Sequence, residues 1–184
     1  MNEILNEADQ KMGKAVGVTR EEFATIRAGR ANPNMFSKLV ADYYGSPTPI
    51  QQLASFSSQD ARTILVAPYD MGALAAVEKA IRDSDLGVNP SNDGKSIRCV
   101  FPELTEERRK EYIKIARGKA EDGKVSVRNV RRNAKQDLEK LEKDGEVGKD
   151  DVTGAEKRLD GLTKKHTDEI DEMLKNKEAE LLEV

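Results

Sequence analysis

Hydrophobic residues recur along the second half of the chain with the spacing of a long helix. No proline interrupts the stretch from Thr105 to about Leu141. Glu106 and Glu107 stand in its expected first turn, where carboxylates suit the positive end of a helix. Apolar or small residues follow in steps of mostly three and four: Ile113, Ala116, Ala120, Gly123, Val127, Val130, Ala134 and Leu138. This spacing predicts one helix whose stripe faces partner helices along its whole length.

Two further segments carry stripes of the same kind. Residues 2 to about 29 form the first expected helix, with the stripe Leu5, Ala8, Met12, Val16, Thr19, Phe23 and Ile26. The last expected helix runs from about Asp150, with the stripe Val152, Ala155, Leu159, Leu162, His166, Ile170 and Met173. Because each helix must bury its stripe against the others, the pattern predicts a three-helix bundle built from both ends of the chain.

The sequence between the first two helices has another character. All six prolines lie between Pro33 and Pro102, together with six of the eight Phe and Tyr residues. Strands are expected at residues 39–44, 62–69 and 96–101, and a helix at 71–86, with the segments 45–49 and 89–95 as turn and loop. The fold class is therefore α+β: a discontinuous three-helix bundle (residues 1–30 and 104–184) with an inserted small β/α/β domain (31–103). The two connecting segments are the expected hinges: Ala31, Asn32 and Pro33, and Phe101, Pro102 and Glu103.

Charge adds a candidate binding surface. The chain is slightly acidic, with a net charge of −3, and 35% of its residues are charged, yet one file of the central helix is almost entirely basic. Its members are Lys110, Lys114, Arg117, Glu121, Lys124, Arg128, Arg131 and Lys135, with Arg132 beside them. Such a file creates a local field that attracts phosphate, and arginine binds phosphate bidentately. The alternative is an ordinary solvated helix face, and the pattern alone does not decide between the two.

The sequence gives little support for a catalytic function. Cys99 is the only cysteine and His166 the only histidine, so no zinc or nucleophile constellation can be assembled from them, and both fit a packed structural role. The segment from Gly87 to Ser96 has the wrong spacing for a phosphate-binding P-loop. We also find no signal-peptide core and no membrane-spanning run. We expect a cytoplasmic, monomeric protein that is not an enzyme and needs no cofactor, metal or small-molecule substrate.

Five longer motifs give the chain a resemblance to the ribosome recycling factor family. They are IRAGRANP (26–33), YYGSPTPIQQLAS (43–55), VEKAIRDSDLGVNP (77–90), PELTEERRKE (102–111) and VRNVRRNAK (127–135). The resemblance implies an L-shaped molecule that, with elongation factor G and GTP, splits the post-termination ribosome and allows release of mRNA and tRNA. It also implies contacts to large-subunit ribosomal RNA through Arg131, Arg128, Arg109, Arg27 and Arg30.

The candidate RNA-binding set therefore combines both arguments: Arg131, Arg128, Arg132, Arg109, Arg27, Arg30, Arg117, Lys124 and Lys135. For Arg27 and Arg30 a structural explanation competes, because cations are favoured at the C-terminus of a helix. For the whole protein, the main alternative is a structural adaptor that binds partner helices through its seams. A small hydrolase is a weaker alternative.

Overall fold

The computed structural model describes residues 1–183, and the chain divides into two compact units. The first comprises residues 1–23 and 113–179, and the second comprises residues 24–112 and 180–184. The first unit is thus assembled from two distant parts of the sequence, as the helical stripes predict. Its boundaries, however, lie inside the long helices and not at the predicted positions near residues 30 and 104.

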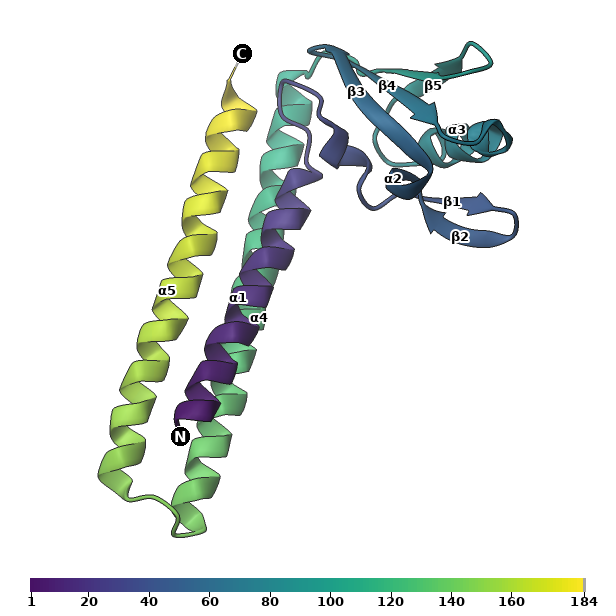
Figure 1. Ribbon diagram of the computed structural model, residues 1–184. Helices are drawn as coiled ribbons and strands as arrows, with labels where there is room; N and C mark the ends of the chain where they lie inside the picture. The colour runs from purple at the N-terminus through teal and green to yellow at the C-terminus, as the bar shows by residue number, and fades with distance from the viewer. Residues whose placement is uncertain (184) are drawn as a thin grey trace. The chain divides into compact units, whose positions relative to one another are not determined.

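Three helices build the first unit: α1 (Asn2–Ala24), α4 (Glu106–Lys143) and α5 (Lys149–Leu182). Figure 1 shows α4 and α5 joined by a short turn, with α1 alongside. Gly145, with φ of 72°, takes up the left-handed conformation in that turn. The three predicted stripes form the core, and its buried members include Leu5, Met12, Val16, Val127, Leu138, Leu159 and Ile170. The predicted bundle is confirmed.

Helix α1 ends at Ala24, about five residues earlier than predicted. Ile26 and Arg27 lie beyond it and are both buried. The side chain of Arg27 packs over the ring of Phe101, with 5.5 Å between its guanidinium carbon and the ring centroid. The prediction that Arg27 and Arg30 occupy the C-terminal turn of a helix is therefore wrong, because no basic residue lies in the last turn of α1.

The second unit contains two antiparallel sheets. In the smaller, β1 (Val40–Tyr43) pairs with β2 (Ser46–Pro49). The larger has the strand order β3-β4-β6-β5, formed by β3 (Ala54–Asp60), β4 (Thr63–Pro68), β6 (Ile97–Val100) and β5 (Asn89–Asn92). Helices α2 (Ile50–Leu53) and α3 (Leu74–Arg82), and 3-10 helices at Pro33–Phe36 and Met71–Ala73, complete the unit.

Strands β2, β3 and β5 were not predicted. The segment of β2 was expected to be a turn and that of β5 a loop, because both contain prolines and few apolar residues. Strands β3 and β5 lie at the two edges of the larger sheet, where one side of the backbone needs no partner and proline or polar residues are tolerated. The central strands β4 and β6 are the apolar ones, and these were predicted.

An aromatic and aliphatic core holds the second unit together. Phe36 packs against Phe56 and Phe101, with ring centroids 5.2 and 6.1 Å apart. Cys99 lies in this core without exposed surface, and burial raises the pKa of its thiol to about 12. The expectation that Cys99 is a packed residue is thus confirmed, since the thiolate form needed for reactivity is strongly disfavoured.

Both predicted hinge segments are attached to one turn of this unit. The backbone N–H of Ala31 donates to the carbonyl of Ala61 at 2.9 Å, and that of Phe101 donates to the carbonyl of Arg62 at 2.7 Å. Ala31 and Phe101 are also buried in the core. These two residues are therefore fixed parts of the second unit, although they belong to the predicted hinges.

Candidate nucleic-acid interface

The basic file of α4 consists of two rows that differ in their partners. The first row contains Lys110, Arg117, Lys124 and Arg131, which follow one another at intervals of seven residues. Three of its side chains form ion pairs with α5: Arg117 with Glu178 at 2.6 Å, Lys124 with Asp171 at 3.0 Å, and Arg131 with Asp160 at 2.7 Å. This row is thus an interhelical ladder along the edge between α4 and α5, the arrangement that flanks the seam of many helical bundles.

The second row points away from such partners. It contains Lys114, Arg128 and Lys135, again seven residues apart, with Glu121 at the position between Lys114 and Arg128. Within residues 1–183, none of these three cations makes a hydrogen bond or an ion pair. Arg128 is exposed and Lys135 is half-buried. The second row therefore presents uncompensated positive charge.

The ion pairs of the ladder leave some of its hydrogen-bond donors unused. Arg131 uses only its Nε to reach Asp160, and its side chain is 42% exposed. Because a guanidinium carries five N–H donors, its two Nη groups remain available. Lys124 is the more committed member, since hydrogen bonds from its ammonium to Glu121 and Asp171 raise its pKa.

Arg132 adds a fourth cation to the VRNVRRNAK segment. It is exposed, and its Nη2 donates to the side chain of Asn129 one turn earlier at 2.8 Å. Arg128, Arg131, Arg132 and Lys135 thus lie within two turns of one helix, as the sequence predicts. The carboxylates of α5 were not foreseen, although Asp160, Asp171 and Glu178 share a helical spacing of eleven and seven.

Arg109 and Arg30 lie in the second unit. Arg109 is half-buried, and its Nη1 donates to the carbonyls of Leu181 (3.1 Å) and Glu183. It therefore satisfies carbonyl groups that the end of a helix leaves without partners. Arg30 is exposed.

Arg27 is the exception among the predicted cations, because only 4% of its surface is exposed. Its Nε and Nη2 have no hydrogen-bond partner in the part of the chain that the structure describes. Burial lowers its pKa, and the nearby Arg62, Arg108 and Arg109 lower it further, while Tyr112 opposes them. In this conformation Arg27 has almost no surface to offer to a phosphate.

His166 is also buried, as its position on the stripe predicts. Its Nε2 lies 2.7 Å from a carboxylate oxygen of Asp9, which joins α5 to α1. Among the described residues, no group of three His, Cys, Asp or Glu side chains could hold a metal ion. None of the helices in residues 1–183 is both long and apolar enough to cross a membrane.

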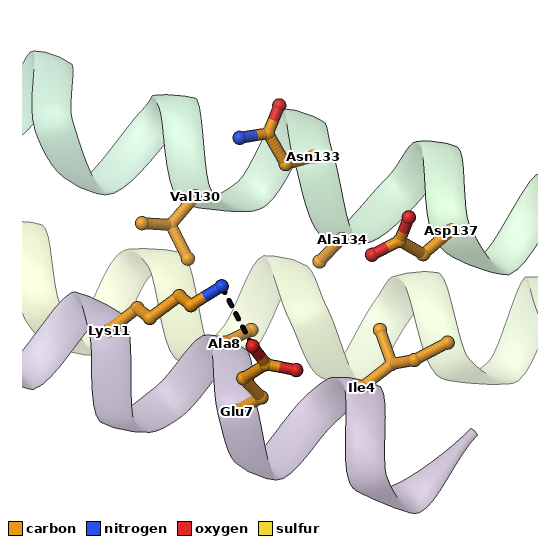
Figure 2. A pocket seen from close by; sticks show the side chains of 8 residues that line it. All are labelled: Ile4, Glu7, Ala8, Lys11, Val130, Asn133, Ala134 and Asp137. Atoms are coloured by element: carbon orange, nitrogen blue, oxygen red, sulfur yellow. Dashed lines mark ion pairs between the residues drawn. The ribbon is translucent and has the colours of Figure 1, made fainter.

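One hollow along the bundle, lined by residues of α1 and α4, is small. Figure 2 shows four side chains of α1 and four of α4 around it: Ile4, Glu7, Ala8 and Lys11, and Val130, Asn133, Ala134 and Asp137. Its volume is about 60 Å³, and two of its lining residues, Lys11 and Glu7, form an ion pair at 2.8 Å one turn apart on α1. This volume suits one or two water molecules and not an organic ligand.

Comparison with known proteins supplies the family. Residues 19–182 match the family model described as ribosome recycling factor. The chain is 77% identical to the ribosome-recycling factor of Nocardioides sp. over the full length of both proteins. It is 62% identical to that of Kocuria rhizophila over 182 residues, which cover 99% of this chain and 98% of the relative.

Solved structures agree. A solution structure of the ribosome recycling factor matches with a TM-score of 0.77 and 39% identity, covering 100% of this chain and 97% of that chain. A second match is a model of the Thermus thermophilus factor, described together with Escherichia coli elongation factor G on the post-termination complex. It has a TM-score of 0.67 and 40% identity, covering 99% of this chain and 98% of that one. With its helical ends, its small sheet domain and these full-length matches, the chain belongs to the ribosome recycling factor family.

Proposed function

We propose that the chain binds large-subunit ribosomal RNA through the basic file of α4, which we call the basic edge of α4. With elongation factor G and GTP, it splits the post-termination ribosome into subunits. The observation that carries the RNA contact is the second basic row: Lys114, Arg128 and Lys135 have no partner within residues 1–183. An uncompensated row on a protein of net charge −3 is a focused site for phosphate.

The ion-pair ladder supports this proposal because its pairs are easily exchanged. A solvent-exposed ion pair contributes about 0.2–1 kcal/mol, whereas a hydrogen bond to a charged group contributes about 1.5–3 kcal/mol. Arg131 therefore gains by binding a phosphate through its two free Nη groups, with or without release of Asp160. The same argument applies to Arg117, and more weakly to Lys124, which has two carboxylate partners.

The other predicted RNA-binding residues are less suited to a phosphate contact than Arg128 and Arg131. Arg132 and Arg30 are exposed and add to the positive field. Arg109 would have to give up its contacts to the carbonyls of Leu181 and Glu183. Arg27 would have to leave the ring of Phe101, so RNA contact by this residue requires a change of conformation.

The energy for splitting comes, in this proposal, from GTP hydrolysis by elongation factor G, which acts on the cytoplasmic ribosome. The chain transmits the motion of elongation factor G to the ribosome. The backbone torsions that can change during this motion lie in the segments without helix or strand. Since Ala31 and Phe101 are held by backbone hydrogen bonds, we place the flexible torsions at residues 25–30 and 102–105. Pro102 and Glu103 fall inside these segments, whereas Asn32 and Pro33 belong to the cap and first turn of a 3-10 helix.

The test is co-sedimentation of the chain with post-termination ribosomes over a salt series. We expect Arg128→Ala and Arg131→Ala each to weaken binding about tenfold, which corresponds to one charge-assisted contact. Each should also lower the slope of log Kd against log salt concentration by about one. The matched control is Arg82→Ala, which removes another surface ion-paired arginine, bound to Glu78 at 2.8 Å on α3, and should bind like wild type.

Two results would contradict the proposal. Wild-type affinity in both α4 variants would mean that the basic edge is an ordinary solvated face. Failure of the wild-type chain to bind ribosomes at all would favour the helical adaptor instead. If binding is confirmed, light scattering with elongation factor G and GTP measures the splitting itself.

A further inference from the structure

Four aspartates of the chain are followed directly by glycine: Asp93, Asp122, Asp144 and Asp160. In such a pair the backbone nitrogen of the glycine can attack Cγ of the aspartate, because glycine has no Cβ atom that hinders the approach. The reaction gives a cyclic imide, which opens to isoaspartate. The four pairs look equivalent in the sequence, so only the structure distinguishes them.

The chemistry of this reaction sets the requirements for a reactive site. The protonated carboxyl group loses its hydroxyl as water while the N–Cγ bond forms and the amide nitrogen gives up its proton. A water molecule then cleaves the bond between this nitrogen and the α-carbonyl carbon, which frees an α-carboxylate and leaves the main chain running through Cβ and Cγ. A reactive site therefore needs an unsupported carboxyl group, access to water and a backbone that can open locally.

The two pairs inside helices do not meet these requirements. Asp122 lies within α4 and Asp160 within α5, both well away from the helix ends, so backbone hydrogen bonds hold the chain on either side. Gly123 is also buried against α1 and α5, and Asp160 is paired with Arg131 at 2.7 Å. Cyclisation at either position would require the helix to unfold.

The pair at Asp93 is exposed, but both of its reacting groups are engaged. Oδ1 of Asp93 accepts the backbone N–H groups of Lys95 and Ser96, each at 2.9 Å. These hydrogen bonds lower the pKa of Asp93, so the protonated form that reacts is rarer. The N–H of Gly94 donates to the side chain of Asn92 at 3.1 Å, which occupies the attacking nitrogen.

The carboxylate of Asp144 has no such support. Asp144 is the first residue after α4, and it lies in the exposed turn that joins α4 to α5 (Figure 1). Within residues 1–183, its side chain makes no hydrogen bond or ion pair. Gly145, which follows it, is exposed as well. Water therefore reaches both reacting groups of this pair.

The backbone around Asp144 is held only by the end of a helix. The N–H of Gly145 donates to the carbonyl of Glu142, and the N–H of Glu146 donates to the carbonyl of Leu141, both at 3.0 Å. With Gly145 at a φ of 72°, the two bonds form a Schellman motif. Hydrogen bonds in the last turn of a helix open by fraying, at a smaller free-energy cost than those inside it. Fraying thus releases the nitrogen of Gly145.

We propose that the pair Asp144 and Gly145 is the site at which this chain forms isoaspartate. The modified chain is then a substrate for an S-adenosylmethionine-dependent carboxyl methyltransferase, the class of enzyme that recognises the α-carboxylate of isoaspartate. One additional carbon atom enters the main chain of the turn, so the Schellman motif at the end of α4 is broken. The inference concerns the bundle alone and is independent of ribosome binding.

The test compares the chain folded in buffer with the chain unfolded in guanidinium chloride, both incubated at neutral pH. Peptide mass spectrometry with electron-transfer fragmentation measures isoaspartate at each of the four sites, and methylation by an isoaspartate methyltransferase measures the total. In the folded chain we expect at least about tenfold more isoaspartate at Asp144 than at any other site. In the unfolded chain the four sites should differ by less than about threefold, because the structure that protects the other three is lost.

Two variants and a matched control assign the product. Asp144→Glu replaces the five-membered imide by a six-membered one that forms far more slowly, so total isoaspartate in the folded chain should fall about fourfold. Asp93→Glu makes the same change at the other exposed pair and should leave the total unchanged. Asp144→Asn reaches the same imide with loss of ammonia and should form isoaspartate at position 144 faster than the wild type.

Three results would overturn the inference. Equal isoaspartate at Asp93 and Asp144 in the folded chain would mean that the hydrogen bonds to Asp93 give no protection. The same distribution in the folded and unfolded chains would mean that sequence, and not structure, sets the reactive site. Absence of isoaspartate at position 144 in folded Asp144→Asn would show that the turn prevents cyclisation.

Discussion

Two glycines in the middle of α4 should respond in opposite directions to the same substitution. From the sequence, Gly118 and Gly123 look equivalent, each costing roughly 1 kcal/mol relative to alanine inside a helix. In the structure they differ. A Cβ atom at Gly118 would have no neighbour within 4 Å, whereas one at Gly123 would lie 2.2 Å from Oγ1 of Thr19 and 3.2 Å from Cδ1 of Ile170.

The contact at Gly123 leaves little room for relief. Only 3% of the surface of Thr19 is exposed, and its hydroxyl donates to the carbonyl of Ala15 at 3.0 Å. Because threonine is branched at Cβ, rotation of its side chain moves a methyl group toward the space that the hydroxyl leaves. A methyl group at Gly123 must therefore push α1 away from α4, and overpacking of this kind costs about 1–3 kcal/mol.

The expected magnitudes follow directly. Gly118→Ala should stabilise the bundle by about 0.5–1 kcal/mol, the gain in helix propensity alone. Gly123→Ala receives the same gain but also the overpacking cost, so we expect a net loss of about 1–2 kcal/mol. Urea unfolding monitored by circular dichroism at 222 nm measures both, and the two variants should differ by about 1.5–3 kcal/mol.

A double variant tests the assigned contact. Thr19→Ala removes the atom closest to the new methyl group, so Thr19→Ala combined with Gly123→Ala should be more stable than the sum of the single effects predicts, by about 1 kcal/mol or more. If Gly123→Ala were as stable as Gly118→Ala, the close approach of α1 and α4 at Thr19 would be refuted.

Three further predictions concern single groups. Asp160→Asn releases Arg131 and should increase ribosome affinity about two- to fivefold while costing less than about 1 kcal/mol of stability, as co-sedimentation and urea unfolding can check. Cys99, with its pKa raised to about 12, should react with iodoacetamide at pH 8 only after the second unit is unfolded in urea; rapid reaction of the folded chain would contradict its burial. Backbone N–H groups of Ser96 and Lys95 lower the pKa of Asp93 below its unfolded value of about 3.9, so its contribution to stability is complete above that value and is lost as pH falls through the lowered pKa. Asp93→Asn should therefore reduce the loss of stability of the second unit between about pH 5 and pH 2, measured by urea midpoints.

Much of the fold could be predicted because the long helices repeat one simple pattern. The stripes of α4 and α5 continue for many turns, and the predicted starts near Thr105 and Asp150 lie within one residue of the observed ones. The edge strands could not be predicted in the same way. A segment such as Ala54–Asp60 is mostly polar, and it is a strand because β4 supplies its hydrogen bonds.

The candidate site shows the same limit. The basic file follows from the positions of cations on one helix, and α4 does contain all of its members. Which of them are free depends on how α5 is rotated against α4, and a single-helix pattern contains no such information. The burial of Arg27 against Phe101 depends likewise on a contact between residues that are 74 positions apart.

The attachment of both connecting segments to one turn has a consequence for how the chain folds during synthesis. Helix α1 leaves the ribosome before the 89 residues of Ala24–Tyr112, and it cannot meet α4 until they have followed. Once the second unit is folded, Ala31 and Phe101 are held at the adjacent residues Ala61 and Arg62, so the intervening chain behaves as a short connection. Shortening an effective loop from about ninety to about ten residues lowers the entropic cost of closure by about 2 kcal/mol. The second unit thus acts as an internal folding template that brings the two ends of the bundle together.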